Sequence, residues 1–285
     1  MVERMDSSKT KVGFLVFVVL TTASCADSPV EVIAIANEGF CIRSSGRTIL
    51  VDALFRATAP YPEFFSQGPS EDLVRKMVVG EGPFSHVDLA LVTHSDGDHF
   101  HAETALEFLG NHPETVLIGT VDVMDALSIV DGFDAVSDRI VIPARTYGSC
   151  ERVEHREIEV NACHARHSGG REVANNIYIV DIRGFHFLHE GDADRSPSTF
   201  AELELPEQGL DIAFLHDWFV LNDGRDVVTD ILKPGAVVLM HHRWERAAET
   251  RQRVELLAAN ITSTLPPITV FAAELESAAF DARSN

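Results

Sequence analysis

The feature that most constrains the fold is a run of seven mostly apolar residues, VDLALVT at 87–93, that ends directly in a segment rich in histidine and aspartate. Continuous apolarity, without alternation, favours a strand buried on both faces, as in a sheet covered by helices. A turn after such a strand can point alternate side chains at one place, and imidazole with carboxylate suits zinc, iron or manganese. The segment offers these potential ligands: His94, Asp96, Asp98 and His99.

Four further polar clusters follow predicted strands later in the chain. They comprise His164 with His167, His189 to Asp194, His216 to Trp218, and His241 with His242. The ends of strands in a layered α/β fold gather on one rim, where binding and catalytic sites are built. Clusters at five strand ends in order therefore predict a single metal site on that rim.

The hydrophobic pattern predicts a single α/β domain in which two sheets pack face to face with helices outside. The expected strands are 31–36, 39–43, 48–52, 87–93, 116–120, 139–143, 156–163, 176–182, 185–190, 211–215, 236–240 and 268–271. The expected helices are 70–78, 101–109, 121–130, 196–204, 222–232 and 244–258. Asn222 is the expected N-cap of its helix. Residues 57–84 otherwise favour a long loop, a kind of segment that often carries function.

Composition excludes wholesale disorder and disfavours one class of partner. Hydrophobic residues make up 45% and charged residues 24% of the 285-residue chain, which is typical of globular proteins. The 44 acidic against 23 basic residues give a net charge of −21. So acidic a surface repels phosphate backbones, and no basic run offsets it. We therefore expect no nucleic-acid partner and a small-molecule substrate instead.

The N-terminus has the order of a secretory signal. Basic residues precede the apolar run VGFLVFVVL at 12–20, and the small residues of TTASC follow it. The run is shorter than the roughly 20 residues that span a bilayer. We expect a signal at 1–24, a linker at 25–30, the domain at 31–275 and a tail at 276–285. The protein would be exported, as a periplasmic protein or as a membrane-anchored lipoprotein.

The cysteines add two expectations. TASC resembles a bacterial lipobox, which would leave a lipid anchor on Cys25, while cleavage without lipid stays open. Cys41, Cys150 and Cys163 then allow at most one disulfide, and the sequence does not decide which pair forms. A disulfide is compatible with export, because oxidising compartments preserve it.

Taken together, these segments resemble the metallo-β-lactamase superfamily, and within it a group similar to ascorbate-6-phosphate lactonases and metal-dependent phospholipases. His94 to His99 matches the motif His-x-His-x-Asp-His at all but one position. The further matches are ILVD at 49–52, ARHSGGR at 165–171, Gly191-Asp192 and Met240-His241. The likeness covers roughly residues 31–272. It implies a four-layered αβ/βα sandwich of two mixed β-sheets with outer helices.

The resemblance also implies which residues hold metal. A first ion would take His94, Asp96 and His167, a second would take Asp98, His99 and His241, and Asp192 would bridge them. Asp98 and Asp192 would also act in catalysis, by orienting the water. One or two divalent ions are implied, with zinc the first expectation. Asp96 stands where the motif has its second histidine. A carboxylate is a harder ligand than imidazole, so the first site could also bind iron or manganese.

Asp96 is the one departure from the motif, and we expect it to be a ligand. An unpaired carboxylate beside Asp98 and Asp192 would have a raised pKa, and a bound cation would remove that penalty. Nearby residues have lesser expected roles. His189, His216 and Asp52 would orient ligands, His164 would be a buried, hydrogen-bonded residue, His242 would support the site or lie on the surface, and Arg171 and Trp218 would contact either substrate or the protein.

The implied function is a metal-dependent hydrolase. A bound metal lowers the pKa of its water from about 15.7 to about 7 and polarises the bond under attack. The bond would be an ester, lactone, amide or phosphodiester. One alternative is an iron-dependent redox or oxygen-using enzyme on the same site. Another is an extracytoplasmic binding protein with a degenerate metal site.

Overall fold

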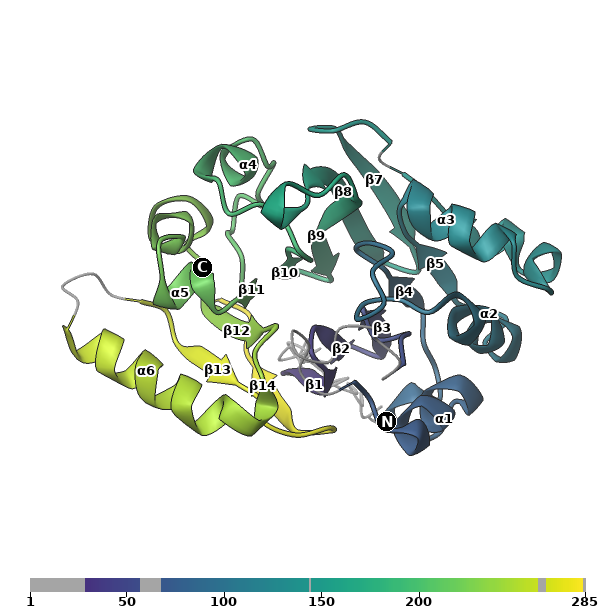
Figure 1. The fold of residues 1–285 in the computed structure, drawn as a ribbon, viewed down its shortest axis with the longest axis horizontal. Helices are drawn as coiled ribbons and strands as arrows, with labels where there is room; N and C mark the ends of the chain where they lie inside the picture. The colour runs from purple at the N-terminus through teal and green to yellow at the C-terminus, as the bar shows by residue number, and fades with distance from the viewer. Residues whose placement is uncertain (1–28, 57–67, 144, 261–264, 284–285) are drawn as a thin grey trace, which may run out of the picture.

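The computed structural model describes residues 29–56, 68–143, 145–260 and 265–283. The expected signal segment, Cys25 and the first part of the long loop lie outside these ranges. Two seven-stranded mixed sheets pack face to face, and helices cover their outer faces (Figure 1). The αβ/βα sandwich expected from the sequence is therefore confirmed.

The first sheet contains the N-terminal strands. Its order is β14-β1-β2-β3-β4-β5-β6. The strands are β1 (Val30–Ala36), β2 (Gly39–Ser44), β3 (Arg47–Val51), β4 (Leu89–Leu91), β5 (Val116–Ile118), β6 (Ile140–Val141) and β14 (Ser277–Phe280). β1 to β3 form an antiparallel meander, and β3 to β6 run parallel. The parallel strands therefore end at one edge of the sheet.

The second sheet repeats this plan. Its order is β13-β12-β11-β10-β9-β8-β7. The strands are β7 (Cys150–His155), β8 (Ile158–Arg166), β9 (Ala174–Ile182), β10 (Phe185–His189), β11 (Ile212–His216), β12 (Ala236–Met240) and β13 (Ile268–Val270). β7 to β10 are antiparallel, and β10 to β13 are parallel. A disulfide joins Cys150 to Cys163 across β7 and β8, and Cys41 is a buried free thiol.

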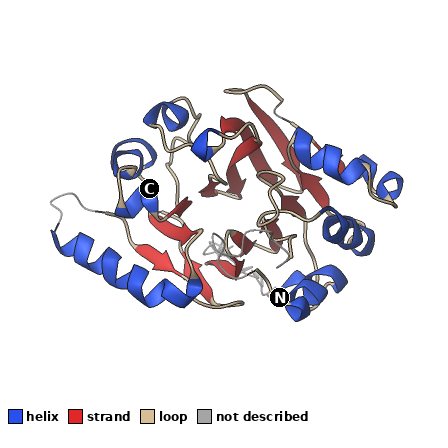
Figure 2. Ribbon diagram, in the orientation of Figure 1, coloured by secondary structure: helices blue, strands red, loops and turns tan. Residues whose placement is uncertain are grey.

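Helices cover the outer face of each sheet (Figure 2). The first sheet carries α1 (Glu71–Val79), α2 (Ala102–Asn111) and α3 (Val121–Ser128). The second carries α4 (Pro197–Ala201), α5 (Trp218–Leu221), a π-helix at Val227–Leu232 and α6 (Ala247–Asn260). Short 3₁₀ turns lie at Gly82–Phe84, Phe133–Ala135, Ser137–Arg139, Ser168–Gly170 and Trp244–Arg246.

The core between the sheets is mostly aliphatic, with several large aromatic residues among the aliphatic side chains. Phe40, Tyr178, Phe187 and Phe214 are buried there with aliphatic side chains of both sheets. Burying one such ring stabilises the fold by about 1.5–3 kcal/mol. This layer fixes the two sheets against each other, and so fixes the distance between residues that the sheets contribute to a shared site.

Local sequence explains where α1 begins and ends. The Ser70 hydroxyl accepts a hydrogen bond from the amide of Leu73, and Gly80 ends the helix in the left-handed region at φ 75°. The apolar residues Leu73, Val74 and Met77 face the sheet. Along the described residues, no helix is both long and apolar enough to cross a bilayer.

The structure corrects three sequence-based expectations. The expected helix at 222–232 is only a π-helix at Val227–Leu232: Asn222 is the C-cap of α5 and not an N-cap, and the π-helix follows Asp226, whose carboxylate accepts from the amide of Val227. Strand β7 was not expected, because its residues CERVEH are mostly exposed and charged. The expected tail contains β14, which pairs antiparallel with β1. The last two strands lie at sheet edges, where a hydrophobic pattern is weakest.

Candidate metal centre

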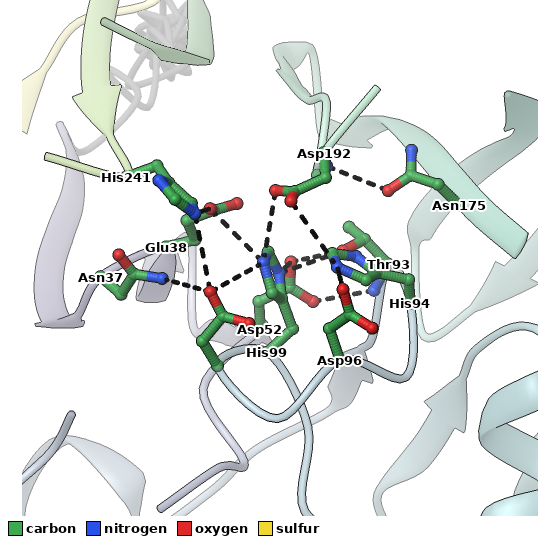
Figure 3. Close-up of polar contacts among 12 residues, drawn as sticks. Asn37, Glu38, Asp52, Thr93, His94, Asp96, His99, Asn175, Asp192 and His241 are labelled. Carbon is green, nitrogen blue, oxygen red and sulfur yellow. Dashed lines mark hydrogen bonds and ion pairs between the residues drawn. The ribbon is translucent and has the colours of Figure 1, made fainter. Parts of the chain in front are cut away.

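The predicted site residues converge where the parallel strands of both sheets end (Figure 3). His94 to His99 follow β4, Asp192 follows β10, and His241 follows β12. His167 follows β8 in the second sheet. The structure thus brings together all seven residues expected to bind metal: His94, Asp96, Asp98, His99, His167, Asp192 and His241.

The first group is formed around Asp96 and Asp192. Asp96 Oδ2 lies 3.6 Å from Nε2 of both His94 and His167. Asp192 Oδ2 lies 3.4 Å from His167 Nε2 and 3.9 Å from His94 Nε2. Two donors of one tetrahedral zinc ion, each about 2.0–2.1 Å from it, lie about 3.4 Å apart. These atoms therefore have the spacing of a metal site, called here the first position.

The second group uses the other oxygen of Asp192. Asp192 Oδ1 lies 3.3 Å from His99 Nε2. Asp98 Oδ2 lies 3.6 Å from His241 Nε2 and 3.9 Å from His99 Nε2. These donors define the second position. Asp192 presents one oxygen to each group, which is the arrangement of a bridging ligand.

Two further residues face the cluster and were not predicted as ligands. Glu38, in the turn between β1 and β2, places Oε1 3.4 Å from His99 Nε2 and 3.3 Å from His241 Nε2. His216 Nε2 lies 3.3 Å from Asp192 Oδ1. His216 was expected only to orient ligands, although its place directly after a strand was visible. Glu38 was not predicted, because a single acidic residue in a short turn is not accompanied by the neighbouring histidines or aspartates that indicate a metal site.

Asp52 orients the segment that follows β4. It is fully buried, and its two oxygens accept from the amide and the hydroxyl of Thr93 at 2.8 and 2.6 Å. Its Oδ2 also accepts from His99 Nδ1 at 2.9 Å. His94 Nδ1 lies 3.0 Å from the Thr93 hydroxyl oxygen. Because Nδ1 of His94 and of His99 donates, the lone pair of each Nε2 is directed at the cluster.

The other histidines are oriented in the same way. His167 Nδ1 donates to the carbonyl of Ser168 at 2.8 Å. His216 Nδ1 lies 2.9 Å from Glu190 Oε1, which also accepts from the His216 amide at 2.8 Å. Each Nε2 is thereby left as the acceptor atom that a metal requires.

The backbone at the site is strained at particular residues. Asn37, Asp52 and His241 have φ of 46°, 44° and 53°, in the left-handed region that residues other than glycine rarely adopt. Gly191 has φ 59°, and a Cβ there would lie 2.5 Å from Asn175 Oδ1 and 2.7 Å from Thr93 Cβ. Such strain persists where the surrounding structure imposes it, and it concentrates at functional sites.

The donor atoms fit a bound cation. Nε2 of His94, His99, His167 and His216, Oδ1 of Asp192 and both carboxylate oxygens of Glu38 are buried without a hydrogen-bond partner. A buried polar atom without a partner costs about 1–3 kcal/mol, and an ion costs more. So many unpaired atoms aimed at common points are explained by divalent cations, which would pair with all of them.

The charges of the cluster perturb its ionisation when no cation is present. Burial, reinforced by Asp192, raises the pKa of Glu38 to about 8. Burial lowers the pKa of His167 and His241, but nearby carboxylates outweigh it and raise both to about 9. Burial lowers the pKa of His216 to about 3. Burial opposes ionisation of Asp192, but surrounding histidines hold its pKa well below the usual value.

Asp96 differs from the expectation of a raised pKa. Burial does raise it, but the nearby imidazoles of His167 and His94 and the guanidinium of Arg171 outweigh burial, so the pKa of Asp96 is lowered. The guanidinium of Arg171 contacts both carboxylate oxygens, with Nη2 3.0 Å from Oδ1 and Nη1 closer to Oδ2. The pKa of Asp96 differs from the expectation because Arg171, in the segment after β8, pairs with its carboxylate. The spacing of histidines and aspartates in the sequence does not predict a contact with this arginine.

The remaining residues support the site or pack nearby. His189 is fully buried and its Nε2 lies 3.1 Å from the backbone carbonyl of Glu38. Trp218 stacks on His216, with ring centroids 3.8 Å apart. His242 Nε2 lies 2.8 Å from the carbonyl of Phe271. His164 is half-buried and outside the cluster.

Comparison with known proteins identifies a family and several relatives. A family model described as a β-lactamase superfamily domain matches residues 34–215. A Pyrococcus furiosus protein named as a UPF0173 metal-dependent hydrolase is 26% identical over 199 residues, which cover 63% of this chain and 80% of that protein. A Pyrococcus horikoshii protein of the same description is also 26% identical, with the same coverage.

Solved structures share the fold at low sequence identity. Igni18, a metallo hydrolase from Ignicoccus hospitalis, is 17% identical with a TM-score of 0.58, over 90% of this chain and all of that one. The metallo-β-lactamase fold protein YhfI from Bacillus subtilis is 11% identical with a TM-score of 0.57, over 88% and 99%. CmlA, a diiron β-hydroxylase from Streptomyces venezuelae, is 14% identical with a TM-score of 0.53, over 90% and 54%.

Proposed function

The chain belongs to the metallo-β-lactamase superfamily, and we propose that this metal-dependent hydrolase uses two metal ions to cleave an uncharged carbonyl substrate, an ester, lactone or amide. The observation that carries the proposal is the set of buried, unpaired imidazole nitrogens and carboxylate oxygens facing two positions that Asp192 connects. When bound, the metals supply a water of lowered pKa and polarise the carbonyl oxygen.

The charge of the site favours an uncharged substrate. The cluster carboxylates Glu38, Asp96, Asp98 and Asp192 carry up to four negative charges, which two divalent ions would balance. Among the described residues, Arg171 is the one Arg or Lys that ion-pairs with these carboxylates, and it is engaged by Asp96. A phosphodiester would bring a further negative charge without a free cation to receive it. We therefore favour carbonyl chemistry over the phosphodiester.

The residues of this chain have separate tasks in that reaction. Asp192 holds both positions at a fixed separation, because its oxygens face different histidines. Asp98 is held in place by the Asn37 side chain, whose Nδ2 donates to Asp98 Oδ2 at 3.2 Å. Both carboxylates would then orient the attacking water as hydrogen-bond acceptors, while its lowered pKa would come from the metals. Asp52 acts as a positioning residue through His99.

Metal analysis and a substrate panel test this proposal. Protein purified without chelators should contain up to two divalent ions per chain and hydrolyse members of a panel of esters, lactones, amides and phosphodiesters. Asp98→Ala and Asp192→Ala should lose both metal and activity, and Asp192→Ala should lose more. His155→Ala, a substitution in β7, is the control and should match the wild type. Full activity in metal-free protein would reject the hydrolase mechanism.

A second candidate is an iron-dependent, oxygen-using enzyme on the same site. The observation that favours it is the carboxylate content of both groups, since Asp96 and Glu38 are harder ligands than imidazole. Iron in the purified protein, with oxygen consumption and no hydrolysis of any panel member, would select this candidate. Zinc or manganese in the purified protein, together with hydrolysis of a panel member, would support the hydrolase instead.

We also propose export from the cytosol. The basic, apolar and small residues in order over 1–25 support it. The disulfide between Cys150 and Cys163 is compatible, because such bonds persist in oxidising compartments. Mass spectrometry of the protein from its host should find a mature chain that starts at or near Cys25. A soluble cytosolic protein that retains Met1 would contradict export.

A further inference from the structure

The turn that carries Glu38 is fixed by contacts to other parts of the site. The Glu38 carbonyl lies 3.1 Å from His189 Nε2, and the Asn37 side chain donates to Asp98. The amide of His241 approaches the Asn37 carbonyl at 3.4 Å. A Cβ at Gly39 would lie 2.8 Å from the carbonyl oxygen of Asp52, so the turn sits directly on the end of β3. These contacts fix the backbone from which the Glu38 carboxylate reaches the cluster.

Among the described residues, Glu38 differs from the buried carboxylates that lie outside the metal cluster. Asp52, Asp88 and Asp211 each accept hydrogen bonds from backbone amides, as structural carboxylates do. Glu190 accepts from the amide and ring of His216. Glu38 is fully buried, and neither of its oxygens has a hydrogen-bond partner. Once ionised, a carboxylate in that state needs a cation, because burial of an unpaired charge is costly.

The atoms around Glu38 are metal donors. Oε1 lies 3.3 Å from His241 Nε2, 3.4 Å from His99 Nε2 and 3.5 Å from His216 Nε2. Two sets of four donors share Glu38 and His241 (Figure 3). One set adds Asp98 and His99, and the other adds Asp192 and His216. Glu38 therefore lies at the junction of both sets.

We propose that Glu38 is a metal ligand of the second position, where it binds the ion together with Asp98, His99 and His241. The inference rests on the proposed function, in that it requires a metal centre. With Glu38 as a second carboxylate, the ligands of this position are harder and include more oxygen atoms than the set Asp98, His99 and His241 that the family resemblance implies. Such a donor set favours Mn²⁺ or Fe²⁺ over Zn²⁺ relative to a position with one carboxylate and two imidazoles.

Titration of the metal-free, full-length protein with MnCl₂ tests the proposal. Electron paramagnetic resonance measures free Mn²⁺, and a parallel titration uses ZnCl₂. In wild type we expect two bound Mn²⁺ ions. In Glu38→Gln, which keeps the size and removes the charge, the Kd of one ion should rise at least tenfold while the other ion is unaffected. Zn²⁺ affinity should fall less than Mn²⁺ affinity.

Thermal stability of the metal-free proteins separates a ligand from a structural residue. Glu38→Gln should be about as stable as wild type, because neither carboxylate oxygen of Glu38 has a hydrogen-bond partner that the substitution would remove. Asp211→Asn is the matched control: its carboxylate accepts from backbone amides of His186 and Arg283. That variant should melt earlier without a change in Mn²⁺ affinity. If Glu38→Gln does not fold, Glu38→Asp should fold and still bind one ion more weakly.

The outcomes distinguish this inference from the proposed function. Unchanged Mn²⁺ affinities in Glu38→Gln would overturn the inference while the metal centre stands. A metal-free Glu38→Gln that melts as early as Asp211→Asn, with wild-type affinities, would assign Glu38 a structural role instead. Wild type that binds neither Mn²⁺ nor Zn²⁺ would reject the proposed function itself.

Discussion

Replacing Asp52 with Asn tests whether the buried hydrogen-bond network, and not the ligands alone, sets metal affinity. Asn tolerates the left-handed backbone that Asp52 adopts at φ 44°, so the backbone is not the cause of any effect. The amide oxygen can still accept from the amide of Thr93, as Oδ1 does at 2.8 Å. The amide nitrogen would instead face His99 Nδ1, which now donates to Oδ2 at 2.9 Å. Two hydrogen-bond donors, the side-chain amide group of the Asp52→Asn variant and the His99 ring N–H, would then face each other without an acceptor.

The magnitude follows from the bonds that change. Loss of the charged acceptor for His99 leaves a buried donor unpaired, which costs about 1–3 kcal/mol. The bond from the Thr93 amide weakens to neutral strength and the Thr93 hydroxyl, which donates to Oδ2, loses its acceptor, together a loss of about 1 kcal/mol. We expect the free energy of unfolding to fall by about 2–4 kcal/mol, or roughly 3–7 °C in Tm. Metal affinity at the second position should fall about 10–100-fold, because His99 loses its orienting partner.

Calorimetric titration of metal and thermal melting measure the two effects. Asp88→Asn is the matched control, because Asp88 is also buried and accepts from a backbone amide, that of Thr48, at 3.0 Å. Asp88 precedes β4 while His94 follows it, so this variant should lose stability and keep wild-type metal affinity. Wild-type affinity in Asp52→Asn would refute the reasoning that orientation through His99 governs binding.

Three further predictions concern stability. Reducing the disulfide, or replacing Cys150 and Cys163 with Ser, should cost about 3 kcal/mol in denaturant titrations, since the bond closes a segment with a sequence separation of 13. Gly191→Ala should lower Tm and metal content together, because its Cβ would overlap Asn175 and Thr93; unchanged melting would contradict the described turn. His167 and His241 have pKa values raised to about 9, so their stabilising charge is complete below pH 6.5 and is lost as pH rises toward 9. Urea midpoints of metal-free protein should therefore fall over that interval, whereas metal-loaded protein should change little.

The sequence predicted the layers and most of the residues that the structure brings together in the cluster, for a physical reason. Parallel strands are marked by continuous apolar runs, and a histidine or aspartate directly after such a run must lie at the end of the sheet. His94, Asp192 and His241 all follow strands in this way. These residues could be predicted to lie together because the parallel strands of both sheets end on the same rim of the fold.

The residues that were not predicted depend on contacts distant in sequence. Glu38 reaches the cluster because the β1–β2 turn of one sheet faces histidines of the other. Arg171 reveals its role only beside Asp96, which lies 75 residues earlier. Strand β14 has the short sequence SAAF, and its pairing with β1 is between the two ends of the described chain. Contacts between residues so far apart in the chain cannot be predicted from the pattern of neighbouring residues.

The donors are divided between two long segments of the chain. Glu38, His94, Asp96, Asp98 and His99 come from the first sheet, and His167, Asp192, His216 and His241 come from the second. A bound ion would act as a cross-link between the two sheets, and neither segment alone carries a full donor set. Its binding energy, about 4 kcal/mol at a thousandfold excess over Kd, would then oppose separation of the two segments rather than local opening of one loop.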